Sequence, residues 1–150
     1  MHDWFDLIHS VSPLFHRGIF LSRLASGEAN QDGIFAAMVI SVCAAVIASL
    51  KRKSTHDYGS VTAQRCLDAI EQIEMHTGRF PFSLESCQIQ YHLYIALGTE
   101  KSLDDVESFR FLGESVTGVK YLVYYQMQDM DTVSQQLLKR LYWLLFVGLW

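Results

Sequence analysis

The uncharged apolar stretch IFAAMVISVCAAVIASL, from Ile34 to Leu50, limits the folds that this chain can adopt. Seventeen residues in a row without a charge must leave water, either inside a protein core or inside a membrane. A membrane-spanning helix needs about 20 apolar residues and usually carries aromatic residues at its ends. This stretch is shorter, is rich in alanine and contains neither Trp nor Tyr. It predicts the central helix of a core, and a membrane anchor over residues 34–50 is the alternative.

Small side chains recur along this stretch at helical spacing. They form a ridge at Ala37, Ser41, Ala44 or Ala45, and Ala48. A ridge of small residues lets a second helix approach closely, because little side-chain volume separates the two backbones. We therefore expect other helices to pack directly on this one.

The rest of the chain has apolar residues every three or four positions and little alternation, which predicts an all-α fold. Expected helices cover residues 13–24, 34–53, 60–77, 84–98 and 103–125, and a closing helix runs from residue 132 to residue 150. The short connections favour antiparallel neighbours. The sequence thus predicts a multi-helix antiparallel bundle of about six to seven helices, in one domain over residues 1–150.

Capping residues mark where these helices should begin. Ser12 with Pro13 as the first helical residue, Asp32, Ser83 and Asp131 are expected N-caps, and the segment Ser102 to Asp105 has the form of a capping box. The helix after residue 102 should turn one apolar stripe inward; that stripe is Val106, Phe109, Leu112, Val116 and Val119.

Composition argues against several classes of function. A net charge of -4 is unfavourable for a wide nucleic-acid interface, which needs clustered Lys and Arg. The three cysteines, Cys43, Cys66 and Cys87, lie far apart inside expected helices, which is typical of buried thiols in a reducing compartment. We expect no metal site and no cofactor.

The residues that could carry chemistry do not form a recognisable catalytic set. His2, His9 and His16 recur every seven residues, whereas helical metal pairs are four residues apart. The paired carboxylates, such as Glu71 with Glu74, fit solvated faces and caps better than a dry catalytic cleft. We therefore expect no catalytic residues and no enzyme activity.

An aromatic group near the middle of the chain has two interpretations. Tyr121, Tyr124 and Tyr125 lie close together at the end of an expected helix. Aromatic residues anchor protein interfaces, so the group is a candidate partner surface. The rim of the core is the alternative.

Several stretches, taken in order, carry a resemblance to a known family. WFDLIHSVSPLFHRGIFLSRL contains Pro13, Phe15, His16, Arg17 and Phe20, and it is followed by the alanine-rich run and by SLESCQIQYHLYIALG. SFRFLGESVTGVKYL then contributes Gly113 and Glu114, and LLKRLYWLLFVG contributes Lys139, Arg140 and Trp143. Together they resemble the N-terminal part of the middle regulatory region of fungal binuclear zinc-cluster transcription factors. The chain departs from that family's pattern at Ser115 and Gly118, and at residues 123–125.

The resemblance implies a regulatory helical module of a gene-specific transcription factor in the nucleus. Such a module acts through protein–protein contacts or through effector-linked helix packing, and the effector is not identified. The family's zinc-cluster DNA-binding domain is not expected within residues 1–150, so no direct nucleic-acid contact is expected of this chain. A small helical interaction or inhibitory protein is the alternative.

The end of the chain matches an interior helix of the family's larger domain, so the resemblance implies an incomplete bundle. Its last helix is expected to leave an apolar surface uncovered, for a partner protein or for a second copy of the chain. The expected surface consists of Trp143, Leu144, Leu145, Phe146, Leu149 and Trp150.

Overall fold

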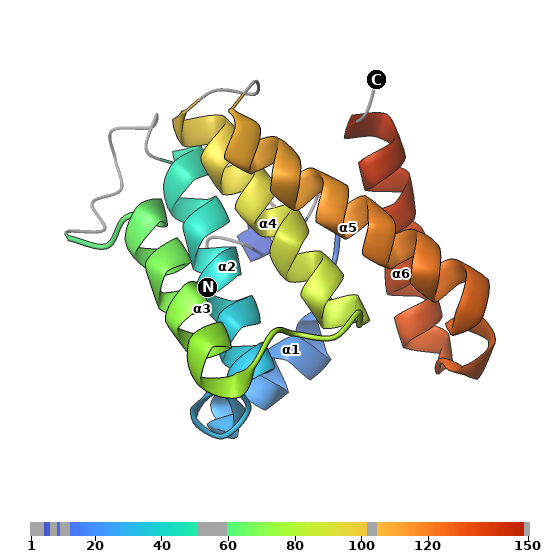
Figure 1. The fold of residues 1–150 in the computed structure, drawn as a ribbon. Helices are drawn as coiled ribbons and strands as arrows, with labels where there is room; N and C mark the ends of the chain where they lie inside the picture. The colour runs from blue at the N-terminus through green and yellow to red at the C-terminus, as the bar shows by residue number, and fades with distance from the viewer. Residues whose placement is uncertain (1–4, 7–8, 10–12, 51–59, 102–104, 149–150) are drawn as a thin grey trace.

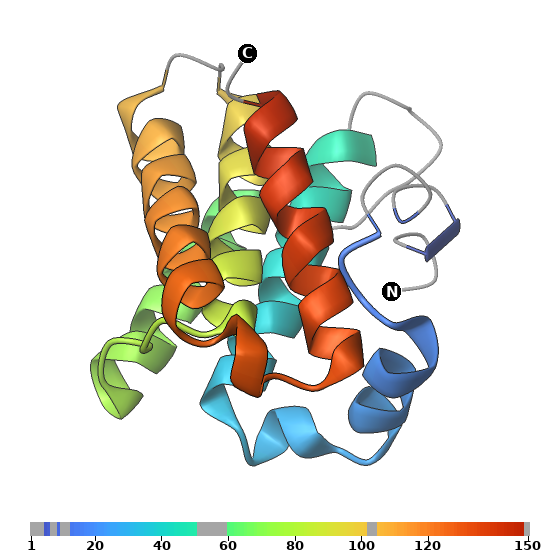
Figure 2. The same ribbon diagram turned by 90° about the vertical axis from the view of Figure 1, so that its right-hand side faces the viewer.

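The computed structural model describes residues 5–6, 9, 13–50, 60–101 and 105–148, and in these ranges it contains helices and no strand. The α-helices are α1 (Arg17–Ala25), α2 (Gly33–Leu50), α3 (Ala63–Thr77), α4 (Leu84–Glu100), α5 (Val106–Tyr125) and α6 (Thr132–Gly148), with short 3-10 helices η2 (Glu28–Asn30) and η3 (Met127–Asp129). From α2 to α6, successive helices alternate in direction (Figures 1 and 2). The prediction of an all-α bundle is confirmed.

Helix α2 lies at the centre and packs against α3 on one side and α4 on the other (Figure 1). Its small-residue ridge is buried as expected, with Ala37, Ser41, Ala44, Ala45 and Ala48 almost inaccessible to water. The hydroxyl of Ser41 donates to the carbonyl of Met38 at 2.8 Å, so its polar group is satisfied inside the core. Close helix packing at small residues therefore organises the bundle.

Helix α2 is also long and apolar enough to span a membrane, with a mean hydropathy of 2.5 over residues 33–50. In the structure, however, 61% of these residues are buried against the rest of the protein. Its apolar surface is thus already covered by other helices, which favours the core interpretation over a membrane anchor.

Three of the expected caps are present. Asp32 Oδ1 accepts from the backbone N–H of Ile34 at 3.0 Å, and Asp131 Oδ1 accepts from that of Ser134 at 3.0 Å. Ser83 forms a reciprocal capping box with Ser86 at the start of α4. Helix α5 begins with Asp105 as its N-cap, while the expected cap Ser102 lies outside the described residues.

The predicted start of the first helix is wrong. Helix α1 begins at Arg17 with His16 as its N-cap, whose Nδ1 accepts from the N–H of Ile19 at 3.3 Å, and Pro13 precedes the helix. The reason is burial, because Leu14 and Phe15 both enter the core from a non-helical segment. The Leu14 carbonyl is satisfied there by the Gln88 Nε2 donor of α4, at 2.7 Å.

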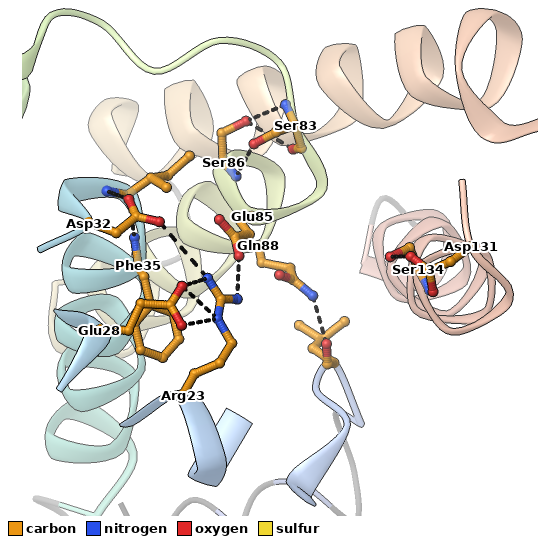
Figure 3. A network of polar contacts seen from close by, with 12 residues as sticks. Arg23, Glu28, Asp32, Phe35, Ser83, Glu85, Ser86, Gln88, Asp131 and Ser134 are labelled. Carbon is orange, nitrogen blue, oxygen red and sulfur yellow. Dashed lines mark hydrogen bonds and ion pairs between the residues drawn. The ribbon is translucent and has the colours of Figure 1, made fainter. Parts of the chain in front are cut away.

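One half-buried arginine joins α1 to its surroundings (Figure 3). Arg23 is paired with Glu28 of η2 at 2.7 Å and with Glu85 of α4, and its guanidinium lies 4.1 Å from the ring centroid of Phe35 in α2. Hydrogen bonding to Glu28 raises the pKa of Arg23, and the same contact lowers the pKa of Glu28. This network fixes the position of α1 relative to the ends of α2 and α4.

The predicted inward face of α5 is wrong in part. Val106 and Phe109 are 83% and 56% exposed, whereas Leu112 and Val119 are buried as expected. The face that meets the rest of the protein instead carries small residues, which are Ser108, Ser115 and Gly118. Their size lets α5 approach α4 closely, and the hydroxyl of Ser115 donates to the Cys87 carbonyl at 2.9 Å.

Gly118 lies where α5 has no room for a side chain against α4. A Cβ atom at this position would lie 2.5 Å from the Sγ of Cys87, which is buried in α4. Gly113, one and a half turns earlier in α5, would place its Cβ in open space. The two glycines therefore have different roles in the same helix.

We expect Gly118→Ala to destabilise the protein by about 1–3 kcal/mol, because the added methyl group overpacks the α4–α5 interface. Gly113→Ala should stabilise it by about 0.5–1 kcal/mol, because alanine has the higher helix propensity. Urea denaturation of both variants measures these changes. Equal free energies of unfolding for the two variants would contradict the close contact.

Candidate functional site

Helix α6 is apolar on two of its faces. The inward face carries Leu138, Leu141 and Leu145, all buried in a cluster with leucines of α5 and with Leu14. This face attaches α6 to the bundle beside α5 and α4 (Figure 2). The second apolar face is turned to solvent.

The solvent-facing residues are Tyr142, Trp143, Phe146 and Val147, which we call the α6 stripe. Trp143 is 62% exposed and Val147 is 70% exposed. The ring of Trp143 lies edge-on to Tyr142 and to Phe146, with centroid distances of 6.2 Å and 5.8 Å. The three aromatic rings thus form one continuous exposed surface along little more than one turn of the helix.

The structure removes Leu145 from the apolar surface expected on the last helix and adds Tyr142 and Val147 to it. Trp143 and Phe146 are exposed, Leu144 is half-buried, and Leu149 and Trp150 lie outside the described residues. The expectation for Leu145 is wrong, since it is 3% exposed and belongs to the inward face.

Sequence reasoning missed Tyr142 and Val147. The signal was their spacing, because residues 142, 143, 146 and 147 share one face of an α-helix. Every residue of the run from Leu141 to Val147 is apolar, so no polar residue marks which face turns outward.

The charge beside the α6 stripe is positive. Lys139 and Arg140 are exposed one turn before it, and the segment Thr132–Gly148 contains no acidic residue. Arg140 Nη1 donates to the carbonyl of Pro13 at 3.4 Å. A partner that covers the stripe should therefore combine an apolar face with acidic residues at its edge.

The remaining residues of the family-like motifs have mainly structural positions. Phe15 and Phe20 are buried with ring centroids 4.8 Å apart. Arg17 is exposed and its guanidinium lies 5.4 Å from the ring centroid of Phe5. Glu114, next to the exposed Gly113, lies 3.7 Å from Arg79.

The tyrosine group forms a second exposed aromatic surface. Tyr121, Tyr124 and Tyr125 are all exposed at the C-terminal end of α5. Tyr121 contacts the ring of Phe82 at a centroid distance of 5.7 Å and that of Tyr125 at 5.3 Å. Because the solvent-exposed Phe82 is its neighbour, this group extends over the loop before α4.

The cysteines have the properties of unreactive thiols. Cys43, Cys66 and Cys87 are free, and burial raises the pKa of Cys66 to about 11 and that of Cys87 to about 12. A thiol with such a pKa carries almost no thiolate, the reactive form, at neutral pH.

Potential metal ligands are not brought together in the described ranges, where no group of three His, Cys, Asp or Glu residues could hold an ion. His9 Nε2 lies 2.9 Å from the carbonyl oxygen of Phe15, His16 caps α1, and His2 lies outside the described residues. Glu74 Oε1 accepts from the N–H of Phe80 at 3.4 Å, while Glu71 is exposed on the same helix.

His92 is a fully buried histidine of α4. Its ring stacks on that of Phe15 with a centroid distance of 5.3 Å and an interplanar angle of 16°. Desolvation lowers its pKa from 6.5 to about 3, so the side chain is neutral at pH 7. It is inaccessible to a substrate and serves the packing between α4 and the segment before α1.

No family model, curated protein or solved structure matches this chain.

We expect His92 to make folding sensitive to acid. The unfolded chain binds a proton below about pH 6.5, whereas the folded protein does not until about pH 3, so stability falls as the pH drops between these values. Between pH 7.5 and pH 5 the loss due to His92 should be about 2 kcal/mol.

Urea denaturation at the two pH values measures this effect. In His92→Phe, the free energy of unfolding should no longer contain the loss that His92 causes between pH 7.5 and pH 5. The control His76→Gln changes an exposed histidine, so its free energy of unfolding should keep that loss. The same pH dependence in all three proteins would show that His92 is not the buried neutral group.

Proposed function

We propose that this protein is a regulatory helical module of a gene-specific transcription factor of the fungal zinc-cluster kind, and that it acts through protein–protein contacts at α6. The observation that carries the proposal is the α6 stripe. Four large apolar side chains face solvent on a helix whose opposite face belongs to the core.

The chemistry of the stripe suits a helical partner. Trp and Tyr are the residues that most often dominate binding energy at protein interfaces. Trp143, Phe146 and Val147 stand at i, i+3 and i+4, the spacing at which side chains of one helix face contact a second helix. The nearby Lys139 and Arg140 favour a partner helix with acidic residues at its edge.

The regulatory part of the proposal rests on the resemblance of the ordered sequence motifs to the zinc-cluster factors. The charge of the chain supports a role other than DNA reading, because a net charge of -4 disfavours phosphate contacts. A nuclear location follows from the same proposal.

A small interaction or inhibitory protein that docks on a full-length relative would use the same stripe. The membrane-anchored alternative requires α2 to leave its contacts with α3 and α4, where most of its surface is buried. The burial of α2 therefore supports an interaction protein over an anchored one.

We expect the double variant Trp143→Glu with Phe146→Glu to lose co-purification with a full-length zinc-cluster regulator of the same organism. Two carboxylates placed in the stripe would have to be desolvated on binding, which lowers affinity by a factor of about 100 or more. Both residues are exposed, so the circular dichroism and thermal midpoint of the protein should change little.

The matched control is Tyr124→Glu with Tyr125→Glu, a second exposed aromatic pair, and it should bind as the unmodified protein does. If the α6 double variant still binds and the tyrosine double variant does not, the interface lies on α5 instead of α6. Sedimentation velocity of the same variants tests self-association, since a dimer through the stripe would dissociate in the α6 variant alone.

A further inference from the structure

The α6 stripe lies on an outer surface of the bundle that is open to a helix of another molecule. Helix α6 stands at the edge of the molecule, in front of α4 and α5 in Figure 2, and its buried leucines are turned away from this surface. Each residue of the stripe is between 41% and 70% exposed. A second helix can therefore lie along the stripe without displacing any helix of the bundle.

The order of the side chains in the stripe suits pairing with a second copy of the chain. Tyr142 and Phe146 follow each other at a distance of one turn on one side of the stripe, and Trp143 and Val147 do so on the other side. If two such helices run antiparallel about a two-fold axis, position 142 of one copy meets position 146 of the other, and position 143 meets position 147. Every stripe residue then contacts an apolar side chain of the second copy.

The charges of α6 favour this antiparallel direction. In the antiparallel pair, the Lys139 residues of the two copies are separated by about 17 Å along the helix axis, at 1.5 Å per residue. Physiological salt screens charges beyond about 8 Å, so their repulsion is weak. A parallel pair would place the same lysines side by side, and residues 132–148 contain no carboxylate that could compensate them.

The end of α6 supplies the negative charge that suits these cations. The last carbonyl groups of an α-helix have no partner within the helix and carry partial negative charge. Helix α6 has no basic residue in its own last turn. In the antiparallel pair, Lys139 and Arg140 of each copy lie beside the C-terminal end of the other copy's α6. Two copies are therefore complementary in charge as well as in their apolar side chains.

The area of the stripe is sufficient for a specific contact. A fully exposed aromatic side chain presents about 200 Å², so the exposed parts of the four stripe residues amount to about 400 Å². Apolar atoms contribute about 60% of the area of a typical interface, so the whole contact would bury about 700 Å² on each copy. Specific interfaces bury about 800 Å² per partner, which places this contact near the lower end of that class.

We propose that α6 pairs with α6 of a second copy of this chain, antiparallel and about a two-fold axis, so that Tyr142 contacts Phe146 and Trp143 contacts Val147 across the interface. This inference rests on the proposed role of α6 in protein–protein contacts and deepens it by naming a second copy as an occupant of the stripe. The pair covers the stripe of both copies. A regulator that binds the same stripe therefore competes with the second copy.

The first test uses the unmodified full chain. Sedimentation velocity is measured at protein concentrations from about 1 to 300 µM, and half-association is expected in the micromolar range because the contact is small for a specific interface. Amide chemical shifts of the 15N-labelled chain are followed over the same dilution series. The shifts that change with concentration should concentrate in residues 139–148. A monomer at every concentration would overturn the proposal.

The second test determines the direction of pairing. Trp143→Lys and Val147→Glu each place a charge against an apolar side chain of the second copy, twice in every dimer, so each variant alone should dimerise at least about tenfold more weakly. An equimolar mixture of the two should recover most of this loss. In the mixed dimer one lysine faces one glutamate, and the other contact remains Trp143 with Val147.

The matched control is again Tyr124→Glu with Tyr125→Glu, which should dimerise as the unmodified protein does. Loss of the dimer in this control would overturn the proposal, because the contact would then lie on α5. A mixture of Trp143→Lys and Val147→Glu that associates no better than its components would also overturn it, since only the antiparallel pair brings these two positions together. All the substituted residues are exposed, so circular dichroism should show unchanged folding.

The outcomes separate this proposal from the proposed function. A monomeric protein whose binding to the regulator still depends on Trp143 and Phe146 would overturn the dimer and leave the proposed function standing. A dimer that dissociates in the stripe variants, in a protein that binds no regulator, would support the dimer and remove the regulator as the partner.

Discussion

The burial of α2 is the constraint on which the rest of the structure depends. Its uncharged surface must leave water, and it does so because Ala37, Ser41, Ala44 and Ala48 let neighbouring helices come close. Helix α4 occupies one side and α3 another. Small residues have the same role one layer further out, where Ser115 and Gly118 let α5 pack closely on α4. The bundle is therefore assembled outward from one helix by contacts between small residues.

The α6 stripe and a groove on the other side of the bundle both arise where this assembly runs out of neighbours. Helix α6 covers α5 and α4 with Leu138, Leu141 and Leu145, but the part of the chain that the structure describes offers nothing to cover Trp143 and the rest of the stripe. On the other side, α3 packs on α2 and stands apart from α5, which leaves a groove between α3, α4 and α5. The first surface is apolar beside positive charge, and the second has more carboxylates than arginines.

Local signals predicted much of the fold and little of the sites. The starts of three helices could be predicted from their N-caps, which are Asp32, Ser83 and Asp131. A cap can be recognised in the sequence because it is a contact between residues that are close along the chain. The inward face of α5 was misjudged because the contact depends on small size, which apolar periodicity does not register, and Phe109 was placed inside although it is exposed. Leu145 was misplaced because its run is apolar on every side. The groove depends on how α3 stands relative to α5, which is not encoded locally.

Hydrogen exchange of the α2 amides in detergent-free buffer tests the central role of this helix most directly. If α2 is the buried centre of the bundle, its amides exchange only on global unfolding and are the slowest of the protein, together with those of α4. Rapid exchange along residues 34–50 in a protein whose other helices are protected would contradict this account. So would protection of α2 that appears only when lipid or detergent is added.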